Sequence, residues 1–397
     1  MKKTFISILL LFVCVSLFAA DIDMQIHWGT KEAQLKSMSS AGKQKNFYTG
    51  NYTPEKLRAL SGDELFGALN TLMGNTCKLD QSGYDYNALR YSYVNVDKDL
   101  NNSGNIIGYY DGQSMNGTWD GGTTYNREHT WPQSKGADKD TPMGYDMQSV
   151  RPANTSINSS RGSKAYGESN NYYDPDEIAI NNPLYETSHL GSYRGDCARV
   201  ILYDYAVYGS AGGHSNKFYL GNAQLLNKLG KNGVFESIAI LLKWHMLDPS
   251  SLTEMVRNDG AQTYQGNRNP FIDYPELAIQ MLKDKVTTYQ VNVTGAEMWP
   301  AYSLTLSYGF IAYMGTKTSR PEEVTVTGAT STYDKTSGKL TITNVKGAVS
   351  ISVASPQALE ETEDGQKAIK TIHNGQIVII KNGKAYTILG APVGDIR

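Results

Sequence analysis

The spacing of apolar residues changes near residue 318, and this change limits the architectures open to the chain. Before that point apolar residues recur three and four positions apart, most clearly over 192–208 and 235–246, a period that predicts helices. Asp248-Pro249 should start a further helix, with Asp248 as its N-cap. After residue 318 short runs alternate apolar and polar side chains, which is typical of strands. The pattern predicts an α+β protein, in which a mixed α/β domain is followed by a small all-β C-terminal module.

The predicted strands of this C-terminal module occupy 323–327, 339–344, 348–354, 376–380 and 384–389. The last two flank Asn382-Gly383, and Asn-Gly between alternating apolar residues is the strongest short-range signal for a β-hairpin. The module contains His373 but no acid–histidine pairing, so we assign it no chemistry.

The N-terminus has the form of a secretory signal. Lys2 and Lys3 precede an apolar run over 5–15, and small residues follow up to Ala20. The run is too short to anchor the chain across a bilayer, and no later stretch approaches 18 consecutive apolar residues. We therefore expect a signal peptide at 1–20, a main domain at 21–317 and the β module at 318–397. Such a protein is secreted or held at the cell surface, with the periplasm as an alternative.

The net charge limits how the chain could bind a polyanion, and the cysteine count leaves a disulfide possible. Lys and Arg total 37 against 39 Asp and Glu, a net charge of −2, so a uniformly basic nucleic-acid-binding surface is excluded. A polyanion would have to be met by a local cluster of positive charge or by a metal ion. Beyond residue 20 the cysteines are Cys77 and Cys197. They could pair in an oxidising compartment or remain as two buried thiols.

One block concentrates side chains suited to phosphodiester chemistry. Residues 125–136 read Tyr-Asn-Arg-Glu-His-Thr-Trp-Pro-Gln-Ser-Lys-Gly. His129 is a candidate general base, because an ordinary histidine pKa of about 6.5 suits proton removal near neutral pH. Glu128 offers the hard anionic oxygen that Mg²⁺ or Ca²⁺ prefers, and Asn158 offers an amide oxygen from a short helix expected after Pro152. Two protein ligands leave most of an octahedral shell to water and substrate phosphate, as Mg²⁺ commonly requires.

The geometry of a β-strand restricts how Glu128 and His129 could act together. Adjacent residues of a regular strand point to opposite faces, so Glu128 and His129 can share a site only where a strand ends or bulges. Pro132 is consistent with a strand end. The block also has ordinary explanations, namely a structural Glu–His pair, a capping asparagine and a solvated charged loop. The cations that could face a phosphate are Arg151, Arg161, Lys135 and Lys139.

The block resembles the endonuclease I family, periplasmic and secreted bacterial nucleases with a ββα-metal, or His-Me finger, centre. The matching positions are Asn126, Glu128, His129, Pro132, Asp146, Pro152, Asn158 and Arg161. Further motifs match over 194–203, 242–258 and 265–273, so the resemblance extends over roughly 45–280. Gln148 departs from the pattern, because relatives often carry histidine there. The stretch that supplies the family's phosphate-binding arginine is also shorter here.

The resemblance implies a ββα-metal motif within a nuclease domain that hydrolyses DNA, and RNA as a further substrate, leaving 5′-phosphate ends. It implies that His129 activates water and that Glu128 and Asn158 hold one divalent ion, Mg²⁺ first, with Ca²⁺ or Mn²⁺ as alternatives. Arg161 and Arg151 are the candidates for stabilising the phosphate, ahead of Lys135. We expect a monomer without a membrane span. The C-terminal pattern resembles modules of secreted bacterial proteins that serve export or surface attachment.

Two alternatives remain open at the level of sequence. The chain could be a non-enzymatic surface protein that binds nucleic acid or glycan with an inactive nuclease domain. It could instead be a metal phosphodiesterase for small phosphoesters. A long positive surface beside His129 would favour nucleic acid, whereas a closed pocket would favour a small ester.

Overall fold

The computed structural model describes most of the nuclease-like region and the strands of a C-terminal sheet. The described residues are 46–79, 85–163, 166, 193–209, 219–221, 234–315, 320–353, 369–373, 376–381, 384–387 and 392–394. The chain divides into two units, Met1–Ser352 and Val353–Arg397. The expected signal peptide at 1–20 and the Asn382-Gly383 turn lie outside the described residues.

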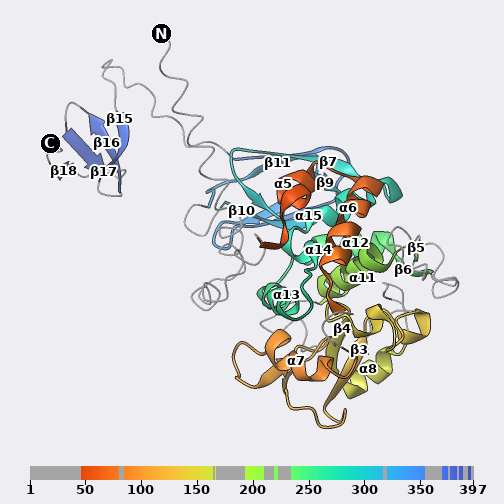
Figure 1. Ribbon diagram of the computed structural model, residues 1–397. Coiled ribbons are helices and arrows are strands. Elements are labelled where there is room, and N and C mark those ends of the chain that lie inside the picture. The colour runs from red at the N-terminus through yellow and green to blue at the C-terminus, as the bar shows by residue number, and fades with distance from the viewer. Residues whose placement is uncertain are drawn as a thin grey trace. The chain divides into compact units, whose positions relative to one another are not determined.

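Helices form the centre of the first unit (Figure 1). They are α5 (Pro54–Arg58), α6 (Gly62–Thr76), α7 (Leu89–Val96), α8 (Thr155–Arg161), α11 (Arg194–Tyr208), α12 (Ile238–Leu247), α13 (Leu252–Gln265), α14 (Pro270–Asp273) and α15 (Glu276–Leu282), with short 3₁₀ turns η2 (Gly50–Tyr52), η4 (Gln133–Lys135), η5 (Pro142–Tyr145) and η7 (Lys283–Lys285). Helix α11 is buried along nearly its whole length and packs against α6 and α12. The helix expected at 192–208 is thereby confirmed as a core element.

Two details of the helix predictions are wrong. Residues 234–237 form a strand, β6 (Val234–Ser237), so the helix predicted from Phe235 begins at Ile238. The N-cap of α13 is Ser251, whose hydroxyl accepts a hydrogen bond from the amide of Glu254 while the Glu254 carboxylate accepts one from the amide of Ser251. This reciprocal capping box satisfies two amides at the helix start. Asp248 accepts a hydrogen bond from the amide of Gly195 instead.

Two four-stranded sheets follow the helices. One has the order β11 (Thr325–Thr327), β14 (Val349–Ser352), β7 (Tyr289–Thr294), β9 (Leu304–Thr305), and the other β12 (Thr330–Asp334), β13 (Lys339–Thr343), β10 (Phe310–Met314), β8 (Met298–Trp299). The strands expected at 323–327, 339–344 and 348–354 are β11, β13 and β14. Strand β14 pairs in parallel with β7, and β13 pairs antiparallel with β10. A division of the chain after residue 317 would therefore separate hydrogen-bonded strands.

The second unit is a small antiparallel sheet with the order β15 (Ile369–His373), β16 (Gln376–Lys381), β17 (Lys384–Thr387), β18 (Pro392–Gly394). Lys381 of β16 pairs with Lys384 of β17, the register that a two-residue turn requires. Helices, mixed sheets and this terminal sheet together confirm the predicted α+β class with an all-β C-terminal module.

Three small pairs of strands and two cysteines complete the description. Strand β1 (Asn105–Ile107) pairs with β2 (Ser114–Asn116), β3 (Tyr125–His129) with β4 (Val150–Asn154), and β5 (Tyr219–Gly221) with β6. No disulfide joins the half-buried Cys77 to the buried Cys197, so the alternative of two cysteines without a mutual bond holds in the described structure. Among the described residues no helix has the length and hydropathy needed to cross a membrane.

Candidate active site

Strands β3 and β4 and helix α8 build a compact strand–strand–helix motif near the bottom of Figure 1. The two strands pair antiparallel, from Tyr125 opposite Asn154 to His129 opposite Val150. Helix α8 starts directly after β4, because the side chain of Asn154 accepts hydrogen bonds from the amides of Ser156 (2.9 Å) and Ile157 (3.4 Å) and so acts as its N-cap. The short helix expected after Pro152 is confirmed.

Glu128 and His129 are the last two residues of β3, so the strand ends at the position expected from Pro132. Asn158 hydrogen-bonds through its amide nitrogen to the side-chain oxygen of Asn126. Asn126 precedes Glu128 by two positions, and residues two apart on a strand share a face. Helix α8 therefore brings Asn158 to the face of β3 that carries Glu128.

The imidazole of His129 is held by two partners. Its Nε2 donates to the carbonyl oxygen of Gly144 (3.0 Å), and its Nδ1 accepts from the side-chain amide of Gln133 (3.1 Å). Only glycine fits at 144, since a Cβ there would lie 1.8 Å from the carbonyl oxygen of Asp138. Burial lowers the pKa of His129 to about 4, and the positive charge of Arg127 acts in the same direction. The ring is therefore neutral near pH 7 with its basic lone pair on Nδ1.

The carboxylate of Glu128 is almost fully buried and is held through one oxygen. Its Oε1 accepts hydrogen bonds from the hydroxyl of Tyr110 (2.6 Å) and from Nη1 of Arg161 (2.9 Å). Burial raises the pKa of Glu128, while Arg161 and the Tyr110 hydroxyl oppose that shift. Among the described residues both hydrogen bonds end on Oε1, which leaves Oε2 as the oxygen that neither bond uses.

Tyr110 was not predicted as a site residue. Its hydroxyl also bonds to that of Tyr166, and its backbone adopts φ +82°, which few residues other than glycine adopt. A strained backbone conformation that persists in a packed region is characteristic of functional sites. A Gly-Tyr-Tyr-Asp-Gly loop over 108–112 was the only sequence signal available for it.

Arg161, a predicted catalytic residue, is fully buried. Besides the bond to Glu128, its guanidinium donates to the carbonyl oxygens of His129 (2.9 Å) and Thr130 (2.7 Å). These bonds fasten the end of β3 to the end of α8. The arrangement favours a positioning role for Arg161.

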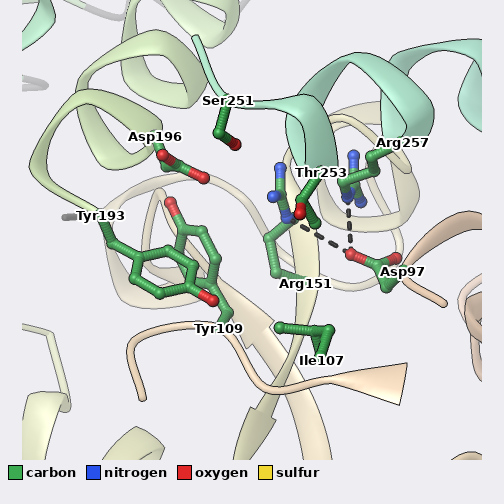
Figure 2. A pocket seen from close by; sticks show the side chains of 9 residues that line it. All are labelled: Asp97, Ile107, Tyr109, Arg151, Tyr193, Asp196, Ser251, Thr253 and Arg257. Atoms are coloured by element: carbon green, nitrogen blue, oxygen red, sulfur yellow. Dashed lines mark hydrogen bonds and ion pairs between the residues drawn. The ribbon is translucent and has the colours of Figure 1, made fainter. Parts of the chain in front are cut away.

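Arg151 lies opposite Glu128 in the β3–β4 register, and its side chain lines a pocket (Figure 2). Its guanidinium lies over the ring of Tyr109, 4.7 Å from the ring centroid, and its Nε is 3.6 Å from the carboxylate of Asp97. Arg257 donates to the same carboxylate at 2.6 Å. The pocket is lined by Asp97, Ile107, Tyr109, Arg151, Tyr193, Asp196, Ser251, Thr253 and Arg257. Arg151 is thus engaged with protein groups and nearly buried.

Asp146 and Gln148 are buried and form hydrogen bonds within the protein interior. The carboxylate of Asp146 accepts hydrogen bonds from the hydroxyls of Tyr203 and Tyr208 and from the side chain of Gln265, all at 2.7 Å. Gln148 donates to the side chain of Asn258 at 2.8 Å. Gln148, at the position where a histidine is common in the family that the sequence resembles, is thereby hydrogen-bonded to helix α13.

The donors present fit a hard divalent ion. Among the described residues no group of three or more His, Cys, Asp and Glu side chains could hold a metal. One carboxylate and one amide form a smaller set. Because the nitrogen of the Asn158 side chain donates to Asn126, its oxygen remains as the donor. Glu128 Oε2 and Asn158 Oδ1 are the oxygen types that Mg²⁺ selects while keeping several waters.

Removing the hydroxyl of Tyr110 should weaken the support of Glu128. We expect Tyr110→Phe to lower the free energy of unfolding by about 1.5–3 kcal/mol, the range for a hydrogen bond to a charged group. Denaturant unfolding in metal-free buffer measures this. Tyr308→Phe is the matched control because Tyr308 is 49% exposed. Equal stability of the two variants would show that the Tyr110 hydroxyl does not support the carboxylate.

The part of the chain that carries this motif is similar to known proteins. The family model described as Endonuclease I matches residues 67–276, which include β3, β4 and α8. An extracellular ribonuclease of Bacillus amyloliquefaciens is 32% identical over 235 residues, covering 55% of this chain and 73% of the relative. An extracellular ribonuclease of Bacillus subtilis (strain 168) is 30% identical over 233 residues, covering 55% and 74%.

Proposed function

Because this chain belongs to the endonuclease I family and is a nucleic-acid hydrolase, we propose that it is a secreted, divalent-metal-dependent endonuclease that cleaves DNA and RNA without sequence specificity. One observation carries the proposal: Glu128 and His129 end a strand of a strand–strand–helix motif whose helix carries Asn158. The two Bacillus relatives, named as extracellular ribonucleases, support action on RNA outside the cell.

In the proposed mechanism His129 removes the proton from the attacking water. The carbonyl of Gly144 holds the proton on Nε2, so Nδ1 is the atom that accepts another. The same carbonyl then stabilises the imidazolium that forms. Gln133 is exposed and donates to Nδ1, so its amide marks the position that a water would take when substrate is bound.

Glu128 and Asn158 hold the cation in this proposal. Mg²⁺ is the expected ion, with Ca²⁺ or Mn²⁺ as alternatives, and when bound it supplies positive charge to the phosphate and to the departing 3′ oxygen. Arg161 and Tyr110 fix the Glu128 carboxylate, and Asn126 fixes the amide of Asn158. Departure of the 3′ oxygen leaves the phosphate on the 5′ end of the product.

Sequence-independent binding follows from contacts that reach only phosphate and metal, since these carry no base information. The affinity for nucleic acid should therefore fall as salt is added, in a linear relation between log K and log salt concentration. Filter binding in 50–200 mM salt, with the cleavage-deficient His129→Ala chain, measures the slope. A slope near zero would contradict phosphate-dominated binding.

We also propose roles for the N-terminal segment and for the C-terminal sheet. Residues 1–20 would act as a signal peptide that is removed on export, which places the mature protein outside the cytoplasm. The C-terminal sheet at 369–394 would serve export or surface attachment, and the enzyme would act as a monomer.

One set of assays separates this function from its alternatives. The chain lacking residues 1–20 is incubated with supercoiled plasmid, ribosomal RNA and a small chromogenic phosphodiester in Mg²⁺. We expect cleavage of both polymers, with products whose 5′ ends accept a labelled phosphate only after phosphatase treatment. Cleavage of the small diester alone would establish a small-ester phosphodiesterase. Binding of the polymers without cleavage would establish a non-enzymatic protein.

A further inference from the structure

Aromatic rings and guanidinium groups form a continuous ladder that starts at His129. Its members come from the segment before α7, from α7 itself, from the loop after β2 and from β3. In order from the site outward they are His129, Tyr86, Arg127, Trp119, Arg90 and Tyr91. The proposed mechanism uses only the first of them.

The inner half of the ladder connects the base to β3. The ring of Tyr86 is stacked on the imidazole of His129, with centroids 5.5 Å apart and an angle of 27° between the planes. The guanidinium of Arg127 lies 3.5 Å from the ring centroid of Tyr86 and 5.1 Å from that of Trp119. Arg127 is further fixed by donating to the carbonyl oxygen of Tyr86 at 2.7 Å.

The outer half of the ladder reaches the surface on α7. The guanidinium of Arg90 lies 5.8 Å from the centroid of Trp119 and 4.8 Å from that of Tyr91. The side chain of Tyr91 is 65% exposed, more than any other large hydrophobic side chain in the described part of the chain. Tyr86, Trp119 and both arginines are half-buried, so each retains some exposed surface.

The two arginines of the ladder carry positive charge without a carboxylate partner in the described part of the chain. Within the described residues neither Arg90 nor Arg127 forms an ion pair with a carboxylate. The Nε of each is buried, so a phosphate would meet the terminal nitrogens. A guanidinium is weakly hydrated and stacks flat on aromatic faces while its edges remain able to bind phosphate. In a chain of net charge −2 these two groups place two positive charges along the ladder.

We propose that the ladder binds an unpaired nucleic-acid strand and leads it to His129. A base stacks on the exposed face of Tyr91, and backbone phosphates lie along Arg90 and Arg127. In a duplex the base faces are covered by neighbouring pairs, whereas in a single strand they are free to stack on aromatic and guanidinium planes. The inference rests on the proposed nuclease function and adds a substrate class, single-stranded RNA or DNA in preference to duplex.

Binding to a cleavage-deficient chain tests the ladder separately from catalysis. In the His129→Ala background, with EDTA present, fluorescence anisotropy gives the affinity for a labelled single-stranded 12-mer of mixed sequence and for a hairpin duplex. Tyr91→Ala should weaken single-strand binding by about tenfold or more, the effect of losing one base–aromatic stack, and duplex binding by less than about twofold. Tyr308→Ala is the matched control, because Tyr308 is 49% exposed and carries the Lys243 ammonium 4.8 Å from its centroid.

Salt dependence separates the two kinds of contact. Arg90→Gln should reduce the magnitude of the log K against log salt slope for the single strand by about 0.7, the contribution of one phosphate contact. Tyr91→Ala should leave that slope unchanged. If Tyr91→Ala behaves like Tyr308→Ala, the ladder does not bind substrate, even if the intact chain cleaves nucleic acid. If the intact chain cleaves neither DNA nor RNA in Mg²⁺, the proposed function itself fails.

Discussion

Replacing His129 by alanine should lower kcat/KM for plasmid and RNA cleavage by about 10²–10⁴-fold, the usual contribution of a positioned general base. The reason lies in the local geometry. Gly144 fixes the proton on Nε2, and burial keeps the pKa of the ring at about 4, so Nδ1 carries no proton over the whole neutral range and can accept one where Gln133 now donates. The half-buried ring of Tyr86 is stacked on the imidazole.

The His129→Ala measurement needs controls for folding and for mechanism. His373→Ala is the same change in strand β15 of the C-terminal unit, and it should leave cleavage unaltered. Added imidazole should restore part of the activity of His129→Ala by entering the space of the missing ring, with unchanged circular dichroism. Cleavage by His129→Ala at the rate of the unaltered chain would rule out His129 as the base.

The parts of the site that depend on neighbouring residues could be predicted from the sequence. The end of β3 at His129 follows from the two-residue period of strands and from Pro132 just beyond it. The start of α8 follows from Asn154, a residue type that caps helices. Both features are decided within about five positions of the chain, where steric and hydrogen-bonding rules act directly.

Contacts between distant segments could not be predicted in this way. Tyr86 precedes Arg127 by 41 positions, and Arg161 reaches Glu128 across 33. A basic residue near a catalytic motif suggests a phosphate-binding role. Arg161 instead donates to the buried carboxylate of Glu128 and to the carbonyl oxygens of His129 and Thr130.

Tertiary structure also overrode local preference at two other places. Asp248 is a good capping residue, but its carboxylate accepts from Gly195, 53 positions away, and Ser251 caps α13. The change of pattern near residue 318 suggested a domain boundary. Strands before and after that point share sheets, because β14 aligns in parallel with β7 across more than fifty residues of chain. Strand pairing of this kind depends on packing that one-dimensional periodicity does not record.

Replacing Glu128 by glutamine should remove both the metal response and the activity of the enzyme. The substitution keeps the shape of the side chain but deletes the charge that attracts the cation. In the unaltered chain, Mg²⁺ at about 100 times its dissociation constant should raise the free energy of unfolding by about 2.7 kcal/mol, and EDTA should reverse this and stop cleavage. In Glu128→Gln neither the stabilisation by Mg²⁺ nor cleavage should remain.

A second buried pair supplies the control that separates metal binding from folding. Glu128→Gln leaves the fully buried guanidinium of Arg161 without its carboxylate, and breaking a buried pair in this way lowers stability by about 3–5 kcal/mol. Glu254 forms an equally buried pair with Arg199 at 2.6 Å, in a different part of the unit. Glu254→Gln should therefore destabilise the fold to a similar extent and yet keep its stabilisation by Mg²⁺. If Glu128→Gln retained the Mg²⁺ response, the cation would have to bind elsewhere, whatever happened to stability.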